Sequence, residues 1–464
     1  MGSNLILLSD SYKYCHHLQY PPGTTRIHSY YESRGGDFEE VVFFGLQMII
    51  KKHFLKPVTQ RDIEEASEII SLHLGNDRLF NRSGWEHILN DHDGKIPLRI
   101  RAVPEGSIIP CGNVLMTVEN TCDRCFWVTS FFETALSQVW YPSTVATQSR
   151  ECKKIIKWYL ERTGDPGAAD FKLHDFGFRG VSSVESAGMG GAAHLLNFRG
   201  TDTTEALLYA KNYYGEPMAG FSLPAAEHST ITSWGRENEV DAFRNMINQF
   251  GNGAPGIYAV VSDSYNIFLA CDELWGDKLR DEVMIAPNTL VIRPDSGKLP
   301  DTVIEVLRIL GHRFGCAVNS KGFKVLNKVR VIQGDGVDLG SIKMILGAMY
   351  QGGWSADNIA FGMGGALLQR LNRDTLKFAF KASAIKVSGE WRDVYKEPIT
   401  DTGKNSKRGR LYLIRWDEGS YMTTRMNDHA NDNARRKDVL QTVYENGELV
   451  IDERFSDIRE RAAV

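Results

Sequence analysis

The 464-residue sequence predicts an α/β protein with an irregular, (β/α) barrel-like core of parallel strands and a mixed α+β domain built from its N- and C-terminal segments. Between residues 166 and 375, short apolar runs alternate with stretches of helical spacing, which is typical of a parallel sheet. Residues 1–165 show both kinds of signal in no regular order. We therefore expect a catalytic domain over 166–375, and we expect residues 376–464 to pack with the N-terminal segment.

The N-terminal segment begins with a predicted strand, turn and strand over residues 4–34, with the turn at Pro21–Gly23. Apolar residues at helical spacing predict helices at Phe43–Leu55 and Arg61–Leu74, and Ser83 is the expected N-cap of another helix. Two strands, a long helical stretch and a boundary follow, at Pro97–Val103, Val114–Val118, Phe126–Glu161 and Arg162–Gly167.

Seven short strands are predicted after this boundary. They lie at Phe171–His174, Leu195–Phe198, Gly220–Leu223, Ile257–Val261, Thr289–Ile292, Val329–Ile332 and Asn358–Phe361. Helices are predicted between them at Ser182–His194, Thr204–Tyr214, Ile231–Phe250, Tyr265–Val283, Asp301–Phe314, Ser341–Tyr350 and Ala366–Leu371. About seven such units favour a closed or nearly closed barrel over an open sheet. Phe378–Val387 is either an eighth strand or part of the next domain.

The loops that follow these strands carry most of the chemically active residues. Nearly every one holds an Asp, His, Arg or Gly cluster: His174-Asp175-Phe176, Arg199–Asp202, Ala226–Ser229, Ser262–Ser264, Arg293–Gly297, Gln333–Gly336 and Gly362–Gly365. In a parallel barrel such loops converge on one face, where active sites form. Asp and Gly are also common turn residues, so turn formation is the alternative for each loop taken alone.

Three of these loops suit a phosphate group. Gly334-Asp335-Gly336 and Gly364-Gly365 each lie between a strand and a helix, where backbone N–H groups can approach an anion. Arg293 and Arg179 can grip phosphate oxygens, unless they form ion pairs with nearby carboxylates. The carboxylates in these loops can orient sugar hydroxyls or bind a divalent ion.

An aromatic residue and a histidine complete this face. Phe176, beside Phe178 and Arg179, suggests a platform for a flat ring, although aromatic residues are more often core. His228, beside Glu227, is either structural or catalytic. The residues alone therefore indicate a barrel enzyme that acts on a phosphorylated sugar and a small ring.

Composition excludes several other classes of partner. The net charge of −4 gives no reason to expect nucleic acid, and no apolar run approaches the ~20 residues needed to span a membrane. Seven cysteines, an odd number, fit a reducing cytoplasm. Cys122 and Cys125 lack a second cysteine pair at zinc spacing, so ordinary reduced thiols are expected there.

A longer set of motifs resembles the nicotinate/nicotinamide phosphoribosyltransferase family, and its nicotinamide-specific members in particular. The matching pieces run in order from residue 10 to residue 374: Asp10–Lys13, Tyr20–Pro22, HDFGFRGVSS, NFRGTDT, PAAEHSTIT, VVSDSYN, IRPDSG, IQGDGVD, FGMGG and LLQRLNRD. The resemblance departs from the family at Ala259, where a serine is common, and at Ala366, where a third glycine is common.

The resemblance implies a cytoplasmic homodimer, with active sites at the interface, that makes nicotinamide mononucleotide and pyrophosphate from nicotinamide and phosphoribosyl pyrophosphate. ATP is the implied co-substrate, acting through a phosphorylated His228 that Glu227 is a candidate to orient. Mg²⁺ is the implied cofactor, held mainly by pyrophosphate.

The resemblance also implies a role for each residue of the site. Phe176 would stack on the pyridine ring, Tyr12 of the partner subunit would cover its other face, and Asp202 would accept from the carboxamide. Phosphate and ribose contacts would come from Arg179, Arg293, Asp295, Gly334, Asp335, Gly364, Gly365 and Arg373. The implied phosphate and ATP channel comprises Arg34, Asp263, Lys381, Lys396 and Lys404.

Two alternatives stay open at this point. One is a nicotinate phosphoribosyltransferase, against which Asp202 argues, because an ionised carboxylate repels a substrate carboxylate. The other is a catalytically inert binding or signalling protein on the same scaffold, against which the full set of loop residues argues.

Overall fold

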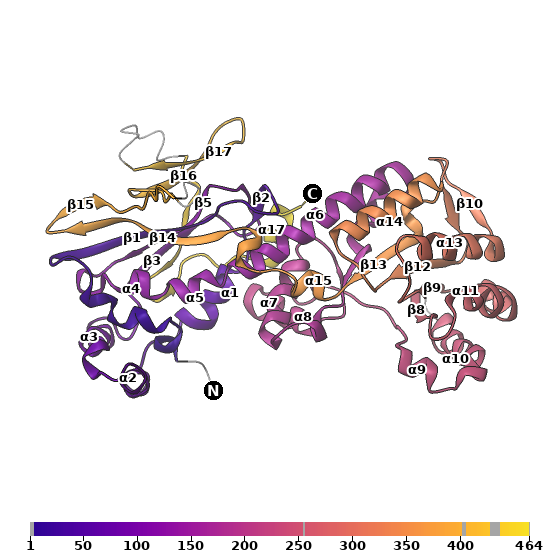
Figure 1. Ribbon diagram of the computed structural model, residues 1–464, viewed down its shortest axis with the longest axis horizontal. Coiled ribbons are helices and arrows are strands. Elements are labelled where there is room, and N and C mark those ends of the chain that lie inside the picture. Colours follow the sequence, from indigo (N-terminus) through magenta and orange to yellow (C-terminus); the bar gives the residue numbers. More distant parts are fainter. Residues whose placement is uncertain (1–3, 254–255, 401–404, 427–436, 464) are drawn as a thin grey trace. The chain divides into compact units, whose positions relative to one another are not determined.

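The structure is a computed structural model that describes residues 4–253, 256–400, 405–426 and 437–463 (Figure 1). The chain forms two compact units, each with its own sheet. Unit 1 comprises Met1–Thr147, Asn212–Glu216 and Asn372–Ala462, and unit 2 comprises Gln148–Lys211, Pro217–Leu371 and Ala463–Val464. The C-terminal segment thus shares a unit with the N-terminal one, and the boundaries follow Thr147 and Leu371, against the expected 165 and 375.

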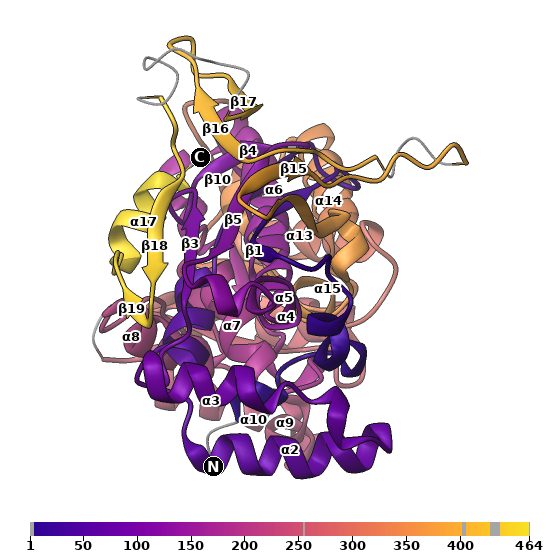
Figure 2. The ribbon, with the colours of Figure 1, turned by 90° about the vertical axis from the view of Figure 1, so that its left-hand side faces the viewer.

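Unit 1 is organised around a seven-stranded antiparallel sheet of strand order β15-β14-β1-β5-β3-β18-β19 (Figures 1 and 2). The strands are β1 (Thr24–Ser33), β3 (Leu98–Ala102), β5 (Val114–Asn120), β14 (Phe378–Val387), β15 (Glu390–Asp393), β18 (Gln441–Glu445) and β19 (Glu448–Leu449). The segment 378–387 is therefore not an eighth barrel strand: it pairs along its length with β1.

Helices and two small sheets complete unit 1. The α-helices are α1 (Leu46–Ile49), α2 (Gln60–Leu74), α3 (Arg82–Asp91), α4 (Val128–Phe131), α5 (Glu133–Ser137), the start of α6 (Trp140–Thr163) and α17 (Phe455–Arg461). The small sheets pair β2 (Glu40–Val42) with β4 (Ile108–Pro110) and β16 (Leu411–Arg415) with β17 (Tyr421–Arg425). Short 3₁₀ or π turns are η1 (Leu5–Leu7), η2 (Ser11–Leu18), η3 (Ile50–Phe54), η4 (Asp77–Leu79), η5 (Asp123–Cys125) and η12 (Arg373–Thr375).

Two expectations for unit 1 are wrong. The first predicted strand is replaced by η1 and η2, because Asn4 caps η1 through a 3.0 Å bond to the Ile6 amide and Tyr14 donates to the Ile6 carbonyl. The N-cap of α3 is Asn81 rather than Ser83, since the Asn81 Oδ1 accepts from the Gly84 amide at 3.1 Å.

Unit 2 is built on parallel strands in the order β7-β6-β13-β12-β9-β8. They are β6 (Leu173–Asp175), β7 (Gly200–Thr201), β8 (Ile257–Val261), β9 (Thr289–Arg293), β12 (Val329–Gln333) and β13 (Ile359–Met363). The main helices are the rest of α6, α7 (Val184–His194), α8 (Thr204–Tyr214), α10 (Glu239–Met246), α13 (Asp301–Phe314) and α14 (Leu339–Gln351). Shorter pieces are η6 (Pro166–Phe171), η7 (Phe178–Gly180), α9 (His228–Thr232), η8 (Arg236–Asn238), η9 (Ile247–Gly251), α11 (Ile267–Leu269), η10 (Ala270–Lys278), α12 (Arg280–Ile285), η11 (Ala356–Asn358), α15 (Gly365–Leu368) and the hairpin β10 (Cys316–Val318) and β11 (Lys324–Leu326).

The segment 221–225 links the two edges of this curled sheet. Phe221 forms a parallel bridge with Gly200 of β7, and Ala225 forms another with Ala259 of β8. Backbone bonds of 2.7 to 3.0 Å at Phe221, Pro224 and Ala226 hold it in place. Seven strand positions therefore follow one another around an irregular barrel in the order of the sequence.

Apolar side chains fill the inside of this barrel. Ala259, Val291 and Ile332, from three neighbouring strands, form a buried cluster. Phe176, Leu223 and Ala360 pack against it. Ala259 thus lies in the apolar interior, where it contributes packing and no hydroxyl.

The strand predicted at Leu195–Phe198 is wrong, because those residues form the turn that ends α7. The Phe198 amide donates to the His194 carbonyl at 3.2 Å, and the two rings stack 5.2 Å apart. Gly188 explains the close packing of α7 on α8, since a Cβ atom there would collide with the Tyr209 ring. The long helices predicted at 231–250 and 265–283 are each divided into shorter pieces.

None of the helices in the described ranges 4–253, 256–400, 405–426 and 437–463 combines the length and apolar character that a membrane span requires.

Candidate active site

Phe176 lies at the mouth of the barrel, directly after β6. Its ring covers Gly362 of β13, because a Cβ atom on Gly362 would collide with it. The Gly334 Cα is also close: an added Cβ would lie 3.5 Å from the ring and 2.9 Å from Asp295 Oδ1. One aromatic ring, one carboxylate and one glycine turn, from three different strand ends, therefore meet at one point.

Arg293 and Asp295 form the charged side of this meeting point. Their Nη2 and Oδ2 atoms lie 3.5 Å apart, and both side chains are largely buried, with 15% and 25% exposure. The Arg293 Nε is buried and has no hydrogen-bond partner among the described residues. A guanidinium held in this way keeps donors available for the oxygens of a phosphate or a sugar.

Asp202 stands at the exposed end of β7. Its Oδ1 accepts a hydrogen bond from the Ser222 hydroxyl, and its backbone amide donates to the Asp175 carbonyl at 3.0 Å. Ser222 belongs to the segment that links the barrel edges, so it holds the Asp202 side chain from the neighbouring strand position.

Asp175 is the fully buried carboxyl at the end of β6. Burial raises its pKa to about 6, and the nearby charge of Asp202 adds to the effect, while the Gly177 amide, which donates at 2.7 Å, opposes it. This hydrogen bond fixes the turn that presents Phe176.

His228 begins α9 and is held by Asp263, which follows β8. The His228 Nε2 lies 3.0 Å from Asp263 Oδ1, and the Asp263 side chain is only 5% exposed, against 46% for the imidazole. The second oxygen of Asp263 accepts from the Ser296 hydroxyl. A carboxylate can only accept, so Nε2 carries a proton, and in the neutral ring the lone pair is therefore on Nδ1.

Glu227 does not orient the His228 imidazole. It is the N-cap residue of α9, its carboxylate accepts from the Ser229 hydroxyl, and its amide donates to the Thr230 hydroxyl at 3.3 Å. The side chain is therefore turned back on its own helix, and Asp263 does the orienting instead.

The remaining predicted glycines form open turns at the same strand ends. Gly364 and Gly365 begin α15, and nothing lies within 4 Å of a Cβ added to Gly365. Gly180, beside the exposed Arg179, packs close to this turn: a Cβ atom added to Gly180 would lie 3.5 Å from the Cα of Gly365. Asp335 is exposed after β12, and its carbonyl accepts from Gln333 Nε2 at 2.8 Å.

Unit 1 holds a separate group of predicted phosphate-binding residues. Burial lowers the pKa of the Lys381 ammonium, and the positive charges of Arg34, Lys396 and Arg373 lower it further, against the opposing charge of Glu133. Arg34 is anchored by Glu32, 2.8 Å from its Nε. These four cations therefore form one positive cluster within unit 1.

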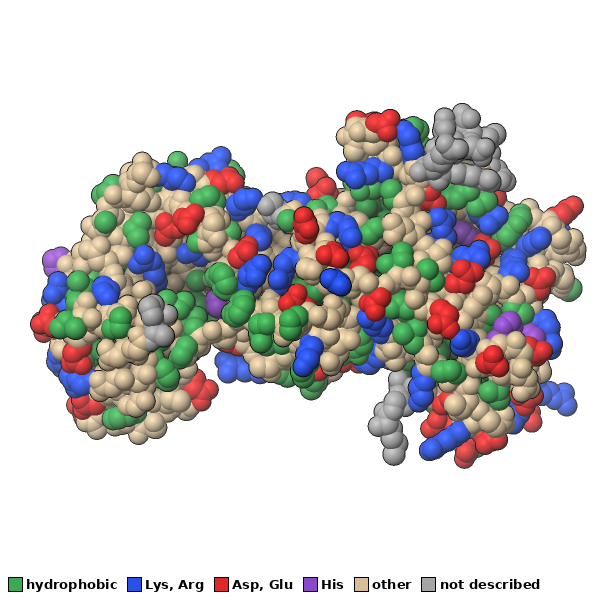
Figure 3. All heavy atoms as spheres, turned by 180° about the vertical axis from the view of Figure 1, so that it is seen from behind, with side chains coloured by type: hydrophobic (Ala, Val, Ile, Leu, Met, Phe, Trp, Pro, Cys, Tyr) green, Lys and Arg blue, Asp and Glu red, His purple; other side chains and the backbone are tan. Residues whose placement is uncertain are grey.

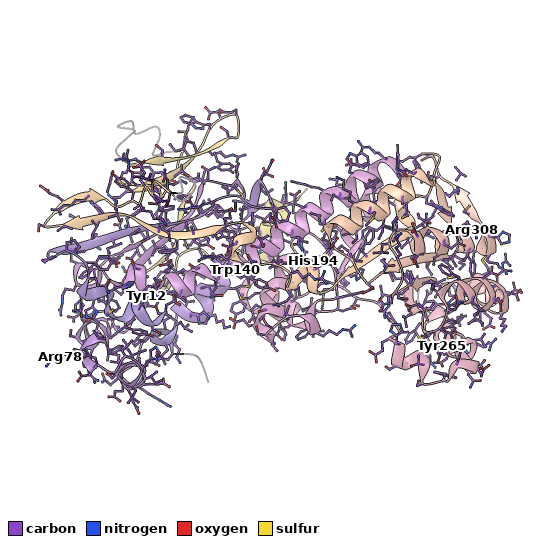
Figure 4. All side chains as sticks on the ribbon, in the orientation of Figure 1. Tyr12, Arg78, Trp140, His194, Tyr265 and Arg308 are labelled. Carbon is purple, nitrogen blue, oxygen red and sulfur yellow. The ribbon has the colours of Figure 1, made fainter. Side chains whose placement is uncertain are left out.

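Two predicted residues lie elsewhere in unit 1. Tyr12 is on η2 with 60% exposure, and its ring is 5.1 Å from that of His16 (Figure 4). Lys404 lies outside the described residues. On the face shown in Figure 3, positive and negative side chains are interspersed, which agrees with the small net charge of −4.

The sequence did not predict the contacts of Ser222 and Ser296, or that Asp263 orients His228. Each signal was present as a polar residue next to a strand end, but short hydroxyl residues are common in turns. Their partners become visible only when neighbouring strands are placed side by side.

Comparison with known proteins places this geometry among pyridine phosphoribosyltransferases. Residues 171–448 match the nicotinate phosphoribosyltransferase (NAPRTase) family, and residues 4–100 match the nicotinamide phosphoribosyltransferase N-terminal domain. A nicotinamide phosphoribosyltransferase of Xanthomonas campestris pv. campestris is 53% identical over 99% of this chain and 98% of that protein. Another, of Acinetobacter baylyi, is 33% identical over 98% of this chain and 96% of that protein.

Solved structures share the fold. A nicotinate-nucleotide pyrophosphorylase from Pyrococcus furiosus superposes with a TM-score of 0.60 at 16% identity, over 99% of this chain and 95% of that chain. Human nicotinic acid phosphoribosyltransferase gives a TM-score of 0.57 at 16% identity, over 98% and 93% of the two chains.

Proposed function

The chain belongs to the nicotinate/nicotinamide phosphoribosyltransferase family, and from this premise we propose that it joins nicotinamide to phosphoribosyl pyrophosphate, giving nicotinamide mononucleotide and pyrophosphate in NAD salvage. It is an enzyme, a phosphoribosyltransferase. The observation that carries the assignment of its site is the meeting of Phe176, Arg293, Asp295 and Gly334 at one point of the barrel mouth.

Catalysis at this point is mainly positioning and charge stabilisation. Transfer of a phosphoribosyl group passes through a ribose with oxocarbenium character, and the departing pyrophosphate needs positive charge nearby. In our proposal Phe176 carries the pyridine ring, Asp295 orients the ribose hydroxyls and Arg293 faces a phosphate. Asp202 accepts from the carboxamide of nicotinamide. The hydrogen bond from Ser222 supports this role, because it limits the rotation of the carboxylate.

Phosphate groups have two further sets of partners in the proposal. The open turns at Gly334–Asp335 and Gly364–Gly365 hold the ribose 5-phosphate by backbone N–H groups. In the positive cluster of unit 1, Arg34, Lys381 and Lys396 serve pyrophosphate or ATP from across the dimer interface, and Arg373 serves the ribose 5-phosphate. Mg²⁺ would be held mainly by pyrophosphate oxygens and would neutralise their charge.

ATP coupling is assigned to His228. The Nδ1 lone pair attacks the γ-phosphorus of ATP, the bond to ADP breaks, and ADP leaves with the electron pair of that bond. Water later attacks the phosphorus of the phosphohistidine, the N–P bond breaks with its electron pair returning to Nδ1, and inorganic phosphate leaves. The hydrogen bond from Nε2 to Asp263 supports this assignment, because Asp263 stabilises the positive charge that the ring gains.

Replacement of His228 tests this coupling. His228→Ala should retain slow ATP-independent synthesis, while the ratio of rates with and without ATP should fall to about one, because the phosphoryl acceptor is gone. Labelling with γ-³²P-ATP should give an acid-labile phosphoprotein in the native enzyme only, with the phosphate on Nδ1 by ³¹P NMR. His312→Ala, an exposed histidine at the end of α13, is the matched control. Undiminished ATP stimulation in His228→Ala would exclude the phosphohistidine.

We also propose that the active enzyme is a homodimer in which Tyr12 of one subunit covers the pyridine ring held by Phe176 of the other. The 60% exposure of the Tyr12 side chain within its own chain supports this. A cytoplasmic setting is proposed because all seven cysteines are free thiols.

A further inference from the structure

Two histidines and two cysteines of unit 1 converge at a place that the reaction does not use. His87 is on α3, His92 directly follows that helix, Cys122 directly precedes η5, and Cys125 is the last residue of η5. One ligand atom from each of the four lies within 4.8 Å of every other. No other group of three or more such side chains gathers in this way among the described residues.

The two histidines present ring nitrogens to this point. His87 Nε2 lies 3.4 Å from Cys122 Sγ, while its Nδ1 lies 2.6 Å from Asp91 Oδ2, one helical turn away on α3. The His92 Nε2 is buried and has no hydrogen-bond partner among the described residues. Burial lowers the pKa of the His92 imidazole, and the neighbouring His87 lowers it further, against the opposing charges of Asp91 and Asp93.

The cysteines are held by the turn between β5 and α4. The Cys125 amide donates to the Cys122 carbonyl at 3.1 Å, and the same carbonyl accepts from Asn120 Nδ2 at 2.7 Å. Cys125 is fully buried and Cys122 is half-buried. Two sulfurs that are separated by two residues on a tight turn have the spacing found in closed zinc sites.

We propose that His87, His92, Cys122 and Cys125 bind one Zn²⁺ as a closed structural site. The expectation of ordinary thiols rested on the lack of a second cysteine pair, but the fold supplies the missing ligands as His87 on α3 and His92 directly after it. In a tetrahedral site the ligand atoms lie about 3.3–3.8 Å apart, as Zn–S and Zn–N bond lengths require. Because the four ligand atoms lie within 4.8 Å of one another, binding needs a contraction of at most about 1.5 Å for any pair.

Charge and protons balance at this site. Zn²⁺ replaces the two thiol protons, which leave to solvent, and the two thiolates neutralise the ion. Burial and the adjacent Cys122 raise the pKa of the Cys125 thiol, so without a metal this sulfur stays protonated. Asp91 accepts from His87 Nδ1–H. Metal-bound histidines are commonly oriented by a carboxylate in this position.

The consequence of the site is structural. Four protein ligands leave no position for a substrate, so the ion would have no catalytic role. It would fasten the end of α3 to the turn before α4, beside the aromatic core in which the Trp85 and Trp127 rings lie 4.8 Å apart. The proposal is independent of the pyridine chemistry assigned to unit 2.

The test is metal binding by the full-length reduced enzyme. Purified protein should contain about one zinc per chain, and after removal with a chelator it should take up about one Co²⁺ per chain. The Co²⁺ form should show the visible bands of a tetrahedral ion and a thiolate charge-transfer band in the near ultraviolet. Cys125→Ser and His92→Gln should each weaken Zn²⁺ binding by more than about 100-fold, and Asp91→Asn by about 10- to 100-fold.

Two variants serve as matched controls. Cys316→Ser removes an exposed thiol and His73→Gln an exposed imidazole, and both should keep the full zinc content. If Cys125→Ser fails to fold, the Co²⁺ spectrum of the native chain and of Asp91→Asn still tests the site. Reduced native protein that takes up no stoichiometric Co²⁺, or Co²⁺ bands without thiolate character, would overturn the proposal.

Discussion

Asp202 places a negative charge where the resemblance puts the substituent of the pyridine ring. Its carboxylate is exposed and accepts a hydrogen bond from Ser222, and no ion pair neutralises it among the described residues of unit 2. A neutral carboxamide can donate to this oxygen, whereas a carboxylate substrate meets like charge. In our proposal this position therefore separates nicotinamide from nicotinate.

Asp202→Asn should move substrate preference towards nicotinate. Removal of the charge removes the repulsion, and a change of about 1.4 kcal/mol corresponds to a tenfold change in the ratio of kcat/KM for nicotinate and nicotinamide. Steady-state kinetics with both substrates measures this ratio. Ser222→Ala is the control, since it removes the hydroxyl and keeps the charge, and its preference should stay with nicotinamide. An unchanged ratio in Asp202→Asn would remove Asp202 from the recognition of the carboxamide.

At the scale of elements, strand β6 ends in the buried carboxyl of Asp175, which also holds the turn that positions Phe176. The Asp175 pKa of about 6 exceeds the ~3.9 of an unfolded aspartate, so the folded state binds its proton more tightly. Such a group contributes its stability fully below the unfolded pKa, and the contribution is lost as pH rises through the folded pKa.

Asp175→Asn should flatten this pH dependence. Between pH 4 and 7 the free energy of unfolding should fall by about 2 kcal/mol more in the native protein than in the variant. Asparagine keeps an oxygen for the Gly177 amide. Urea unfolding across this range measures the difference, and Asp335→Asn, at an exposed carboxylate, should follow the native curve. The Glu105 carboxyl of unit 1, with a pKa raised to about 7 by burial, contributes equally to all three proteins. Parallel curves for the native protein and Asp175→Asn would contradict the assignment.

Elements were predictable where local pattern and tertiary environment agree. β-Branched runs such as Ile257–Val261 and Val329–Gln333 are buried strands, and the positions after them were therefore placed at the barrel mouth. Leu195–Phe198 is equally apolar, yet its burial comes from the turn at the end of α7. Pairs across loops were beyond a one-dimensional pattern: Asp263 meets His228 only because residues 221–225 lie beside β8.

At the scale of the whole molecule, the order of the sequence does not follow the division into units. Unit 1 takes strands from both ends of the chain, and β14 lies between β1 and the edge strand β15. Predicting the barrel was easier because its strands follow one another in sequence, whereas the pairing of β1 with β14 joins distant residues, from Ser33 with Phe378 to Thr24 with Val387.

Mixed dimers test the arrangement of subunits. Inactive Tyr12→Ala chains and inactive Asp202→Ala chains, mixed at equal amounts, should regain about a quarter of native activity, because half of the dimers are mixed and each has one intact site. Activity after subunit exchange measures this. Phe176→Ala mixed with Asp202→Ala is the control and should stay inactive, since both changes lie in the same half of each site. Mixed dimers of the first pair without activity would show that Tyr12 does not act across the interface.

Residues 221–225 join the barrel edges by two isolated bridges and a few backbone bonds, so this is the most weakly paired of the seven strand positions. Local opening of this segment would leave the hydrogen-bonded ladders of the other six strands intact. Ser222 and Asp202 stand on one flank of it, and His228 and Asp263 on the other. A pyridine bound at Asp202 or a phosphoryl group bound at His228 would each stabilise the segment 221–225 in its paired position. Each ligand would therefore lower the free-energy cost of ordering this segment for the other.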